Sequence, residues 1–405
     1  MSTIVQTAPT VSAQVSTSRI ASIDIIRGTV MVLMAIDHVR VFSGVPAGGS
    51  TPAVFFTRWI THFCAPAFIF LAGTSIFFYA RKHTDVSRFL LVRGAWLILL
   101  ELTILRLSWT FNLDFAHYEM AGVLWVIGWC MILMAALVKL PLSVSAVIGA
   151  IIIAAHNLMD SRLWQLADGL NAGKFSGLWK ILYFGFYAGP VQFGSDGPNL
   201  IVLYSIIPWI GVMAVGYAFG SILTFEPARR NRSCMLLGIG AIALFLGLRG
   251  FNLYGDPRPW SQPTPQHAMP ALLSFLNCTK YPASLNFLLM TLGPTIALIP
   301  ILERVSGPIA RALTTFGRVP FFFYVLHIPL IHALSLMVSK LRLGYVSPWL
   351  FTNHPMGNPE PPDGYIWSLP LLYLVWAIAI ALLYFACRWF AGIKASRDDT
   401  WLKYL

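Results

Sequence analysis

The sequence predicts an all-α protein, a polytopic transmembrane bundle of about ten helices. Two observations lead to this fold class. Of the 405 residues, 57% are hydrophobic and only 11% are charged, whereas soluble proteins contain about 25% charged residues. Apolar stretches of about 20 residues, the length at which a helix crosses a bilayer, also recur along most of the chain.

The apolar stretches can be taken in order to define the expected spans. We expect residues 1–18 to form a flexible tail, because they lack the basic and apolar regions of a signal peptide, and residues 19–405 to form a single domain. The expected spans within that domain are 21–42, 52–80, 89–111, 118–138, 142–157, 199–223, 234–248, 283–302, 309–338 and 367–393.

Basic residues gather in alternate loops, which indicates the cytoplasmic side of a membrane protein. With an even number of spans, both termini would lie on that side. The longer loops, at 43–51, 158–198, 250–282 and 339–366, would then lie outside as caps or lids. We therefore expect a multi-pass protein of a bacterial cytoplasmic membrane.

Several other classes of protein are disfavoured. The net charge of +12 is dispersed among short loops and forms no basic patch, so we expect no nucleic-acid partner. The five cysteines are widely scattered without CxxC spacing, which favours buried packing residues over disulfides. No HExxH, P-loop, GxGxxG or GxSxG motif occurs, and we expect no metal site.

The first span, 21–42, carries an unusual number of ionisable side chains. Each charge at membrane depth costs at least a few kcal/mol unless it faces a protein interior or a water-filled cavity. Asp24, Arg27 and His38 share one stripe of the helix, with Arg27 and His38 about 16 Å apart along the axis, while Asp37 points away. We therefore expect this stripe to face a wet, ligand-holding chamber.

The second and third spans each contain two polar residues that could contact a substrate. Arg58 and His62 stand at i and i+4, so they share a face near the outer end of their helix. The alternative is an interfacial arginine and a core histidine. Glu101 and Arg106 could form a charged wall for a polar substrate, or a structural ion pair with another helix.

Two further pairs lie at predicted helix ends. His156 and Asp160 stand one turn apart, so the carboxylate could orient the imidazole as in a general base, or both could cap the helix end. Lys280 and Tyr281 precede a proline before the eighth span and could contact substrate. The lysine could instead extend to the membrane boundary.

The ninth span contains FGRVPFFFYVLHIPLIH, in which Pro320 and Pro329 are expected to interrupt the helix. His327 and His332 lie about 140° apart on a helix, so they cannot both face one site without a kink. We expect His327 to be the one that participates.

Three stretches, SIDIIRGTVMVLMAIDH, RWITHFCAPAFIFLAGTSIFF and GRVPFFFYVLHIPLIH, resemble the catalytic domain of the heparan-α-glucosaminide N-acetyltransferase family. The first is also similar to the type-three membrane acyltransferase superfamily, whose D-x-x-RG opening and histidine eleven residues after the arginine match Asp24, Arg27, Gly28 and His38. This resemblance implies about ten helices, cytosolic acetyl-CoA or another acyl-CoA as co-substrate, and a sugar or other polar acceptor at the outer side.

One feature of that family is missing, because the loop after the first span, SGVPAGGST, contains no histidine. We therefore expect catalysis by His38 or His62, with His38 as general base or as transient acyl carrier. Asp24 and Arg27 would bind acyl-CoA, whose phosphates the arginine attracts. Lys280, Tyr281, Arg58 or His62 could stabilise the thioester oxyanion.

The predicted partners are the lipid bilayer, acyl-CoA and a sugar or glycan acceptor, with a homodimer left open. The alternative function is a transporter of a small polar solute or lipid-linked sugar, which would use the same buried charges as a pathway. A third class, a non-catalytic membrane scaffold, would give no function to the buried histidines and arginines.

Overall fold

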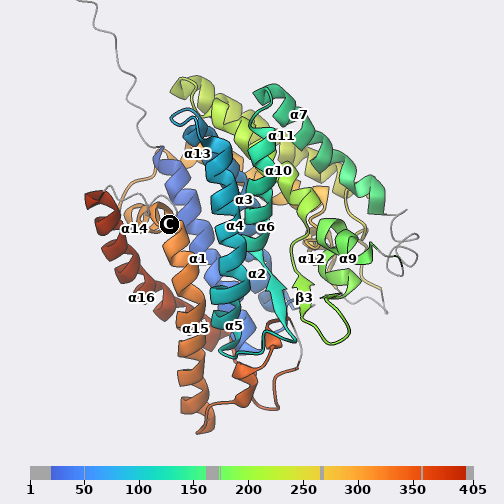
Figure 1. Cartoon of the computed structure of the whole chain (residues 1–405), viewed down its shortest axis with the longest axis vertical. Coiled ribbons are helices and arrows are strands. Elements are labelled where there is room, and N and C mark those ends of the chain that lie inside the picture. The colour runs from blue at the N-terminus through green and yellow to red at the C-terminus, as the bar shows by residue number, and fades with distance from the viewer. Residues whose placement is uncertain are drawn as a thin grey trace, which may run out of the picture.

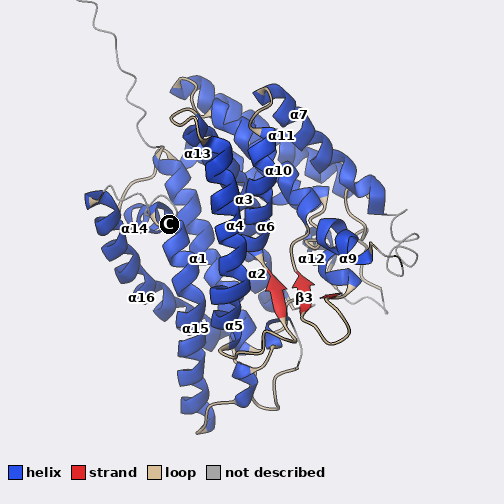
Figure 2. Ribbon diagram, viewed as in Figure 1, coloured by secondary structure: helices blue, strands red, loops and turns tan. Residues whose placement is uncertain are grey.

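The computed structural model describes residues 20–49, 51–160, 173, 175–264, 269–356 and 359–397. The tail predicted at 1–18 lies outside the described residues. The chain is mostly helical, with three short strands at one end of the bundle (Figures 1 and 2). The α-helices are α1 (Ala21–Ser43), α2 (Pro52–Trp59), α3 (Cys64–Ala80), α4 (Val86–Leu100), α5 (Arg106–Thr110), α6 (Val123–Leu137), α7 (Leu142–Ala155), α9 (Ser176–Trp179), α10 (Ile206–Ile222), α11 (Pro227–Gly250), α12 (Ala271–Leu276), α13 (Leu285–Leu302), α14 (Pro308–Arg318), α15 (Pro320–Leu343) and α16 (Leu369–Ser396).

The membrane character of the chain is clear from these helices. Two shorter apolar helices, α6 and α10, accompany six segments that are long and apolar enough to cross a membrane. The number of ten spans and the side of the termini stay predictions. Among the described residues, the six segments are Pro52–Ala80, Leu142–Met159, Pro227–Gly250, Leu285–Leu302, Pro320–Leu343 and Leu369–Ser396.

Two expected spans begin as strands instead of helix. Strand β1 (Glu119–Ala121) pairs in parallel with β3 (Asn199–Val202), and β3 pairs antiparallel with β2 (Val191–Gln192). The chain is mostly helical, as predicted, and these short strands are a local exception. The strands belong to segments that were expected to be the first turns of apolar helices, and a short apolar run does not distinguish strand from helix by itself.

The expected span 309–338 is two helices, α14 and α15, which meet at Val319. Pro320 opens α15, where its missing N–H is tolerated, and it forces Val319 out of helical geometry (φ −129°, ψ 50°). Pro329, which was also expected to interrupt the helix, lies inside a continuous α15.

The second span is broken by a single 3₁₀ turn, Ile60–Phe63, between α2 and α3. Pro66 follows in the first turn of α3 and has no N–H for the His62 carbonyl, which accounts for the change of helix type just before it. The turn lies at the part of the segment that carries His62.

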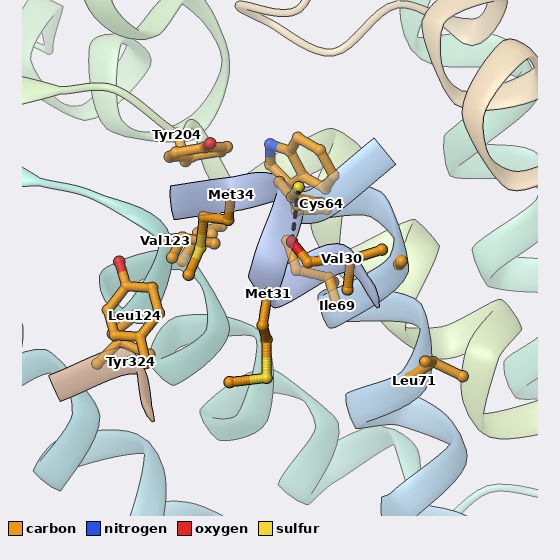
Figure 3. Packing of buried hydrophobic residues seen from close by; sticks show 14 of the residues in the cluster. Val30, Met31, Met34, Cys64, Ile69, Leu71, Val123, Leu124, Tyr204 and Tyr324 are labelled. Carbon is orange, nitrogen blue, oxygen red and sulfur yellow. Dashed lines mark hydrogen bonds between the residues drawn. The ribbon is translucent and has the colours of Figure 1, made fainter. Parts of the chain in front are cut away.

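Helix α1 is the centre of the bundle and packs against α3, α13, α14, α15 and α16 (Figure 1). Its crossing with α14 is so close that a Cβ added at Gly28 would overlap the Leu313 carbonyl group, and one added at Gly317 would overlap that of Asp24. Figure 3 shows the core beside α1, where the Cys64 thiol donates to the Val30 carbonyl at 3.0 Å. All five cysteines are free and buried.

Candidate active site

The second half of α1 borders a cavity of about 580 Å³, called the outer cavity because the basic loops predict that this end of α1 lies outside. Loops cover it, including 44–49, the segment before α10, the segment before α13 and the segment after α15. Six of the residues predicted from the sequence line it together, namely His38, Arg58, His62, Glu101, Lys280 and Tyr281. The structure therefore brings together side chains from four separate parts of the chain.

An inner cavity of about 600 Å³ lies on the other half of α1. Arg27 lines it and forms an ion pair with Asp24 at 3.7 Å, as expected from their i, i+3 spacing, and it also donates to the Ser75 hydroxyl at 2.6 Å. Among the described residues the lining contains no carboxylate but five cations, namely Arg27, Arg93, Arg318, Lys394 and Arg397.

The two cavities share three lining residues, Phe68, Val123 and Tyr324. These side chains from α3, α6 and α15 therefore stand between them, and Figure 3 shows Val123 and Tyr324 close to each other beside α1. The expected stripe does not face one chamber, because Arg27 lines the inner cavity, His38 lines the outer cavity, and Asp24 lines neither.

His38 makes a short contact with a second histidine. Its Nδ1 lies 2.6 Å from Nε2 of His327, and the two rings stack with centroids 4.8 Å apart. His327 is fully buried on α15 and does not line the outer cavity, so its predicted role as a substrate contact is not supported by its position. Trp109 of α5 also packs against the His38 ring, in an edge-to-face arrangement.

Asp37 was expected to point away from the site, but it lines the outer cavity beside His38. Its carboxylate pairs with Arg40 at 2.7 Å and with Arg58 at 3.5 Å. The helical wheel separates Asp37 from the stripe correctly, but the outer cavity wraps around the end of α1 and reaches both faces. Arg40 in turn donates to the Val45 carbonyl, which holds the loop after α1.

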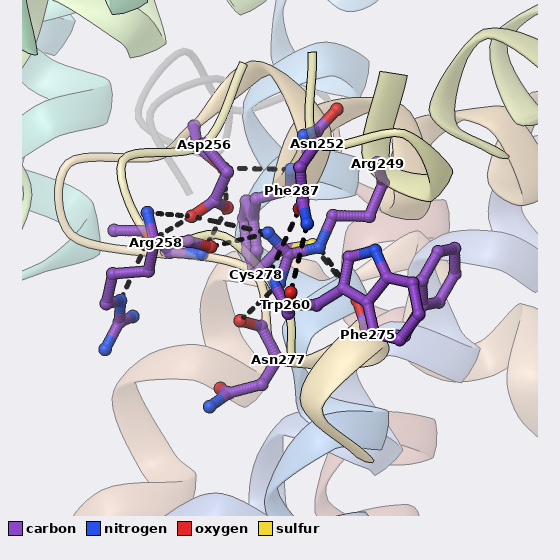
Figure 4. A network of polar contacts seen from close by, with 12 residues as sticks. Arg249, Asn252, Asp256, Arg258, Trp260, Phe275, Asn277, Cys278 and Phe287 are labelled. Atoms are coloured by element: carbon purple, nitrogen blue, oxygen red, sulfur yellow. Dashed lines mark hydrogen bonds and ion pairs between the residues drawn. The ribbon is translucent and has the colours of Figure 1, made fainter. Parts of the chain in front are cut away.

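Lys280 and Tyr281 lie on a segment that Asp256 holds in place. The Asp256 carboxylate accepts hydrogen bonds from the backbone and hydroxyl of Thr279 and from the hydroxyl of Ser284, each at 2.8 Å. Figure 4 shows this carboxylate among the side chains of the loop before α13. The segment thus enters the cavity wall at a fixed position.

The Lys280 ammonium is directed to two aromatic rings, with Nζ 5.2 Å from the centroid of Tyr281 and 5.9 Å from that of Tyr204. The lysine is only 8% exposed, and within the described part of the chain it has no carboxylate partner. Burial raises the pKa of Tyr281, but the Lys280 ammonium and the Arg58 guanidinium more than offset it, so this pKa lies below its usual value. The wall of the outer cavity is therefore electropositive around Tyr281.

His62 and Glu101 complete the predicted lining. His62 is buried against the ring of Phe287, and among the described residues its Nδ1 has no hydrogen-bond partner. Glu101 opens a π-helical turn (Glu101–Leu105) and accepts a hydrogen bond from the Leu124 N–H at 2.7 Å, so it caps the N-terminus of α6. It forms no ion pair with Arg106 in the described structure.

Arg106 lines neither cavity. Its guanidinium donates to the carbonyls of Tyr118, Asn112 and Asp114, and it therefore ties down the loop after α5. The structure supports neither the charged wall nor the interhelical ion pair expected of it, because the carbonyls at this helix end supply enough acceptors.

His156 and Asp160 also line neither cavity, and they do not bond to each other. His156 lies between the carbonyls of Ile152 and Ala283, while Asp160 accepts from Asn157 and Tyr183. Their arrangement fits the alternative interpretation, that of a capped helix end, because the 3₁₀ turn His156–Met159 breaks the spacing of a regular helix.

Sequence reasoning missed several members of the lining. Tyr204, Tyr324 and His354 lie in the outer cavity, and Arg93, Lys394 and Arg397 lie in the inner one. The three cations belonged to the predicted cytoplasmic basic loops, so their charge was the signal that could have found them. No group of three histidine, cysteine or acidic side chains in the described structure could hold a metal ion.

Comparison with protein families matches residues 19–254 to the family described as heparan-alpha-glucosaminide N-acetyltransferase, catalytic. A search among curated proteins gives no match. The matched part is more than half of the chain and includes α1, α3 and both histidines predicted as catalytic, His38 and His62. The chain therefore belongs to the heparan-alpha-glucosaminide N-acetyltransferase catalytic family and is a membrane-bound acetyltransferase.

Proposed function

We propose that this protein takes an acetyl group, or another acyl group, from cytosolic acyl-CoA and transfers it to a sugar or other polar acceptor at the outer side of a bacterial cytoplasmic membrane. The observation that carries the proposal is the pair of cavities along α1. Among the described residues, one cavity is lined by cations without carboxylates, the other is lined by His38, and the two linings have three residues in common.

The inner cavity suits the phosphate end of acyl-CoA. Arginine binds phosphate through paired N–H donors, and lysine adds a point charge. Arg93, Arg318, Lys394 and Arg397 therefore supplement Arg27 on the side that the basic loops predict to be cytoplasmic. Asp24 forms an ion pair with Arg27 but does not line the cavity, so its role would be to orient the arginine.

The thioester end would extend from Arg27 toward His38. In a continuous α1 these residues are about 16 Å apart along the axis. Phe68, Val123 and Tyr324, which line both cavities, would contact the chain that spans this distance. The acceptor would occupy the outer cavity, under the loops that cover it.

In the reaction, an acceptor hydroxyl or amine attacks the thioester carbonyl while His38 takes its proton. The tetrahedral oxyanion then collapses, the carbon–sulfur bond breaks, and the CoA thiolate receives the proton from His38. An acyl-histidine that forms first on His38 and then reacts with the acceptor would use the same residue. His62 lines the same cavity and is the alternative base.

The electropositive wall would stabilise the oxyanion. Lys280 and Arg58 are the nearby cations, and Tyr281 supplies a hydroxyl beside them. Such donors act most strongly in a site from which water is excluded. Asp37 would keep Arg58 oriented through their ion pair.

The test has two arms. His38→Ala should abolish acyl transfer from acetyl-CoA to a panel of amino sugars while the protein remains folded in the membrane. Normal turnover in this variant would show that His38 is not the general base. Arg318→Gln should raise the Kd of CoA about tenfold, equivalent to about 1.4 kcal/mol, and should affect dephospho-CoA less if it contacts the 3′-phosphate. The control is Arg229→Gln, since Arg229 lies over the Phe225 ring and outside both cavities.

A transporter is the second candidate, because two cavities that approach each other from opposite ends of a bundle could also form a solute pathway. Acetyl-CoA should raise the unfolding temperature of the purified enzyme. Solute uptake into proteoliposomes without CoA, together with no effect of acetyl-CoA on unfolding, would favour the transporter.

A further inference from the structure

The contact between His38 and His327 determines which nitrogen of each ring carries the proton. The Nδ1 of His327 lies 2.6 Å from the Tyr324 carbonyl oxygen and 3.2 Å from that of Phe323. A carbonyl oxygen only accepts hydrogen bonds, so this nitrogen must carry the proton.

The second nitrogen of His327 must then be an acceptor. The side chain is fully buried, and within the described residues no carboxylate pairs with it to stabilise a charged ring. A neutral imidazole carries one proton. With that proton at Nδ1, Nε2 presents a lone pair to His38.

The tautomer of His38 follows from the same bond. Its Nδ1 lies 2.6 Å from the lone pair of His327 and therefore donates. The remaining nitrogen, Nε2 of His38, is left unprotonated on the ring that lines the outer cavity, whereas His327 does not line it. Trp109, packed edge-on at 4.8 Å, restricts rotation of the His38 ring.

We propose that His327 is a positioning residue that holds His38 in the tautomer with the proton on Nδ1, so that Nε2 is the atom that accepts a proton or an acyl group. This inference rests on the proposed function for its chemical meaning. When Nε2 takes the acceptor's proton, the imidazolium retains its bond to His327, whose lone pair stabilises the charge. The proton then passes to the leaving thiolate and the resting state returns.

Other charged side chains surround His38 in the outer cavity. Asp37 and Arg40 lie on its own helix, Lys280 lies on the segment before α13, and Arg58 and Glu101 lie on the walls. In the described structure none of them is bonded to His38 Nδ1, so His327 alone distinguishes one ring nitrogen from the other.

The first experiment is nitrogen-15 NMR of histidine-labelled protein, with the His38 signals identified from their loss in His38→Gln. We expect a protonated Nδ1 and an unprotonated Nε2 in the wild-type protein. The reverse tautomer would overturn the inference even if the enzyme transfers acyl groups. The expected tautomer in a protein that transfers no acyl group would support the inference and refute the proposed function.

The second experiment compares two variants of the positioning residue. His327→Leu removes the acceptor, and we expect kcat to fall about 100-fold with little change in KM, together with a mixed tautomer at His38. His327→Gln offers an amide oxygen close to the position of Nε2 and should restore most of the rate and the wild-type spectrum. Equal spectra and equal rates in the two variants would overturn the inference.

His332 on the same helix provides the control. It is fully buried, contacts the Ser108 and Leu350 carbonyls, and lines neither cavity. His332→Gln should lower the unfolding temperature and leave the spectrum of His38 unchanged. A change in that spectrum as large as in His327→Leu would show that general loosening, and not the acceptor, sets the tautomer.

Discussion

Asp256 is the residue whose replacement tests how the Lys280 segment is held. Its side chain is 1% exposed, and its two oxygens accept four hydrogen bonds: two from Thr279, one from Ser284 and one from the Arg258 N–H. Arg249 adds an ion pair at 3.8 Å. All of these donors converge on one carboxylate beside the outer cavity (Figure 4).

The cost of Asp256→Asn can be worked out from these bonds. An amide keeps one acceptor oxygen, and the hydroxyls of Thr279 and Ser284 can rotate to accept from its NH₂ group. A backbone N–H cannot rotate, so either orientation of the amide leaves the N–H of Thr279 or of Arg258 without an acceptor. Because the bond from the Arg258 N–H is exposed to water, the amide should direct its oxygen toward Thr279. A buried unpaired donor costs about 1–3 kcal/mol, and we expect a loss of stability at or below the low end of that range. Asp256→Ala removes every acceptor, including the one for the part-buried Thr279 N–H, and also removes the ion pair of Arg249, which keeps its bonds to backbone carbonyls. We therefore expect a larger loss, about 1–3 kcal/mol or more.

The assay is thermal unfolding in detergent, combined with acetyl-CoA binding and transfer. We expect both variants to bind acetyl-CoA normally, because the inner cavity is separate, and to transfer slowly, because Lys280 is displaced. Asp363→Asn is the matched control, an exposed carboxylate far along the chain from this loop. Wild-type stability and turnover in Asp256→Ala would refute the reasoning.

Two further predictions concern the packing around the site. Gly28→Ala should destabilise the protein by about 1–3 kcal/mol, because its Cβ would overlap the Leu313 carbonyl. Gly240→Ala, with open space around it, should not destabilise, and thermal unfolding of both variants checks this. Glu101→Gln should unfold like the wild-type protein because an amide oxygen still accepts from Leu124, whereas Glu101→Ala should lose about 0.5–2 kcal/mol as other lost caps do. Similar unfolding of the two Glu101 variants would contradict the capping role.

Local sequence patterns predicted most of the helices because apolar length is a strong signal. They failed at Val319, where a proline divided one long apolar run, and at β1 and β3, where strand pairing joins segments about 80 residues apart. Such pairing depends on tertiary contacts that a window of residues does not contain.

The candidate site was predicted in part for a similar reason. Spacing along one helix correctly paired Asp24 with Arg27. Spacing could not show that His327 bonds to His38, since 289 residues separate them. It also suggested a functional pair at His156 and Asp160, but the helix changes to a 3₁₀ turn at His156 and the two side chains bond elsewhere.

The Gly28 of the D-x-x-RG stretch has a physical explanation that the sequence alone did not provide. In the structure the glycine allows the backbone of α14 to contact α1, with the Leu313 carbonyl carbon 2.7 Å from the position of an added Cβ. Because α14 ends at Arg318, this close crossing also sets the position of one wall of the inner cavity. The motif thus combines a charged residue for the site with a small residue for helix packing.

The family match ends at residue 254, but the site does not. His38 and the cap at Glu101 come from the matched part, whereas Lys280, Tyr281 and His327 come from the remainder. In the proposed mechanism the matched part would supply the base and Arg58, and the later part would supply Lys280 and the hydrogen-bond acceptor that orients the base. Tyr324, which lines both cavities, also belongs to the later part. Variants of Lys280 and His327 should therefore impair transfer, although both residues lie outside the matched part.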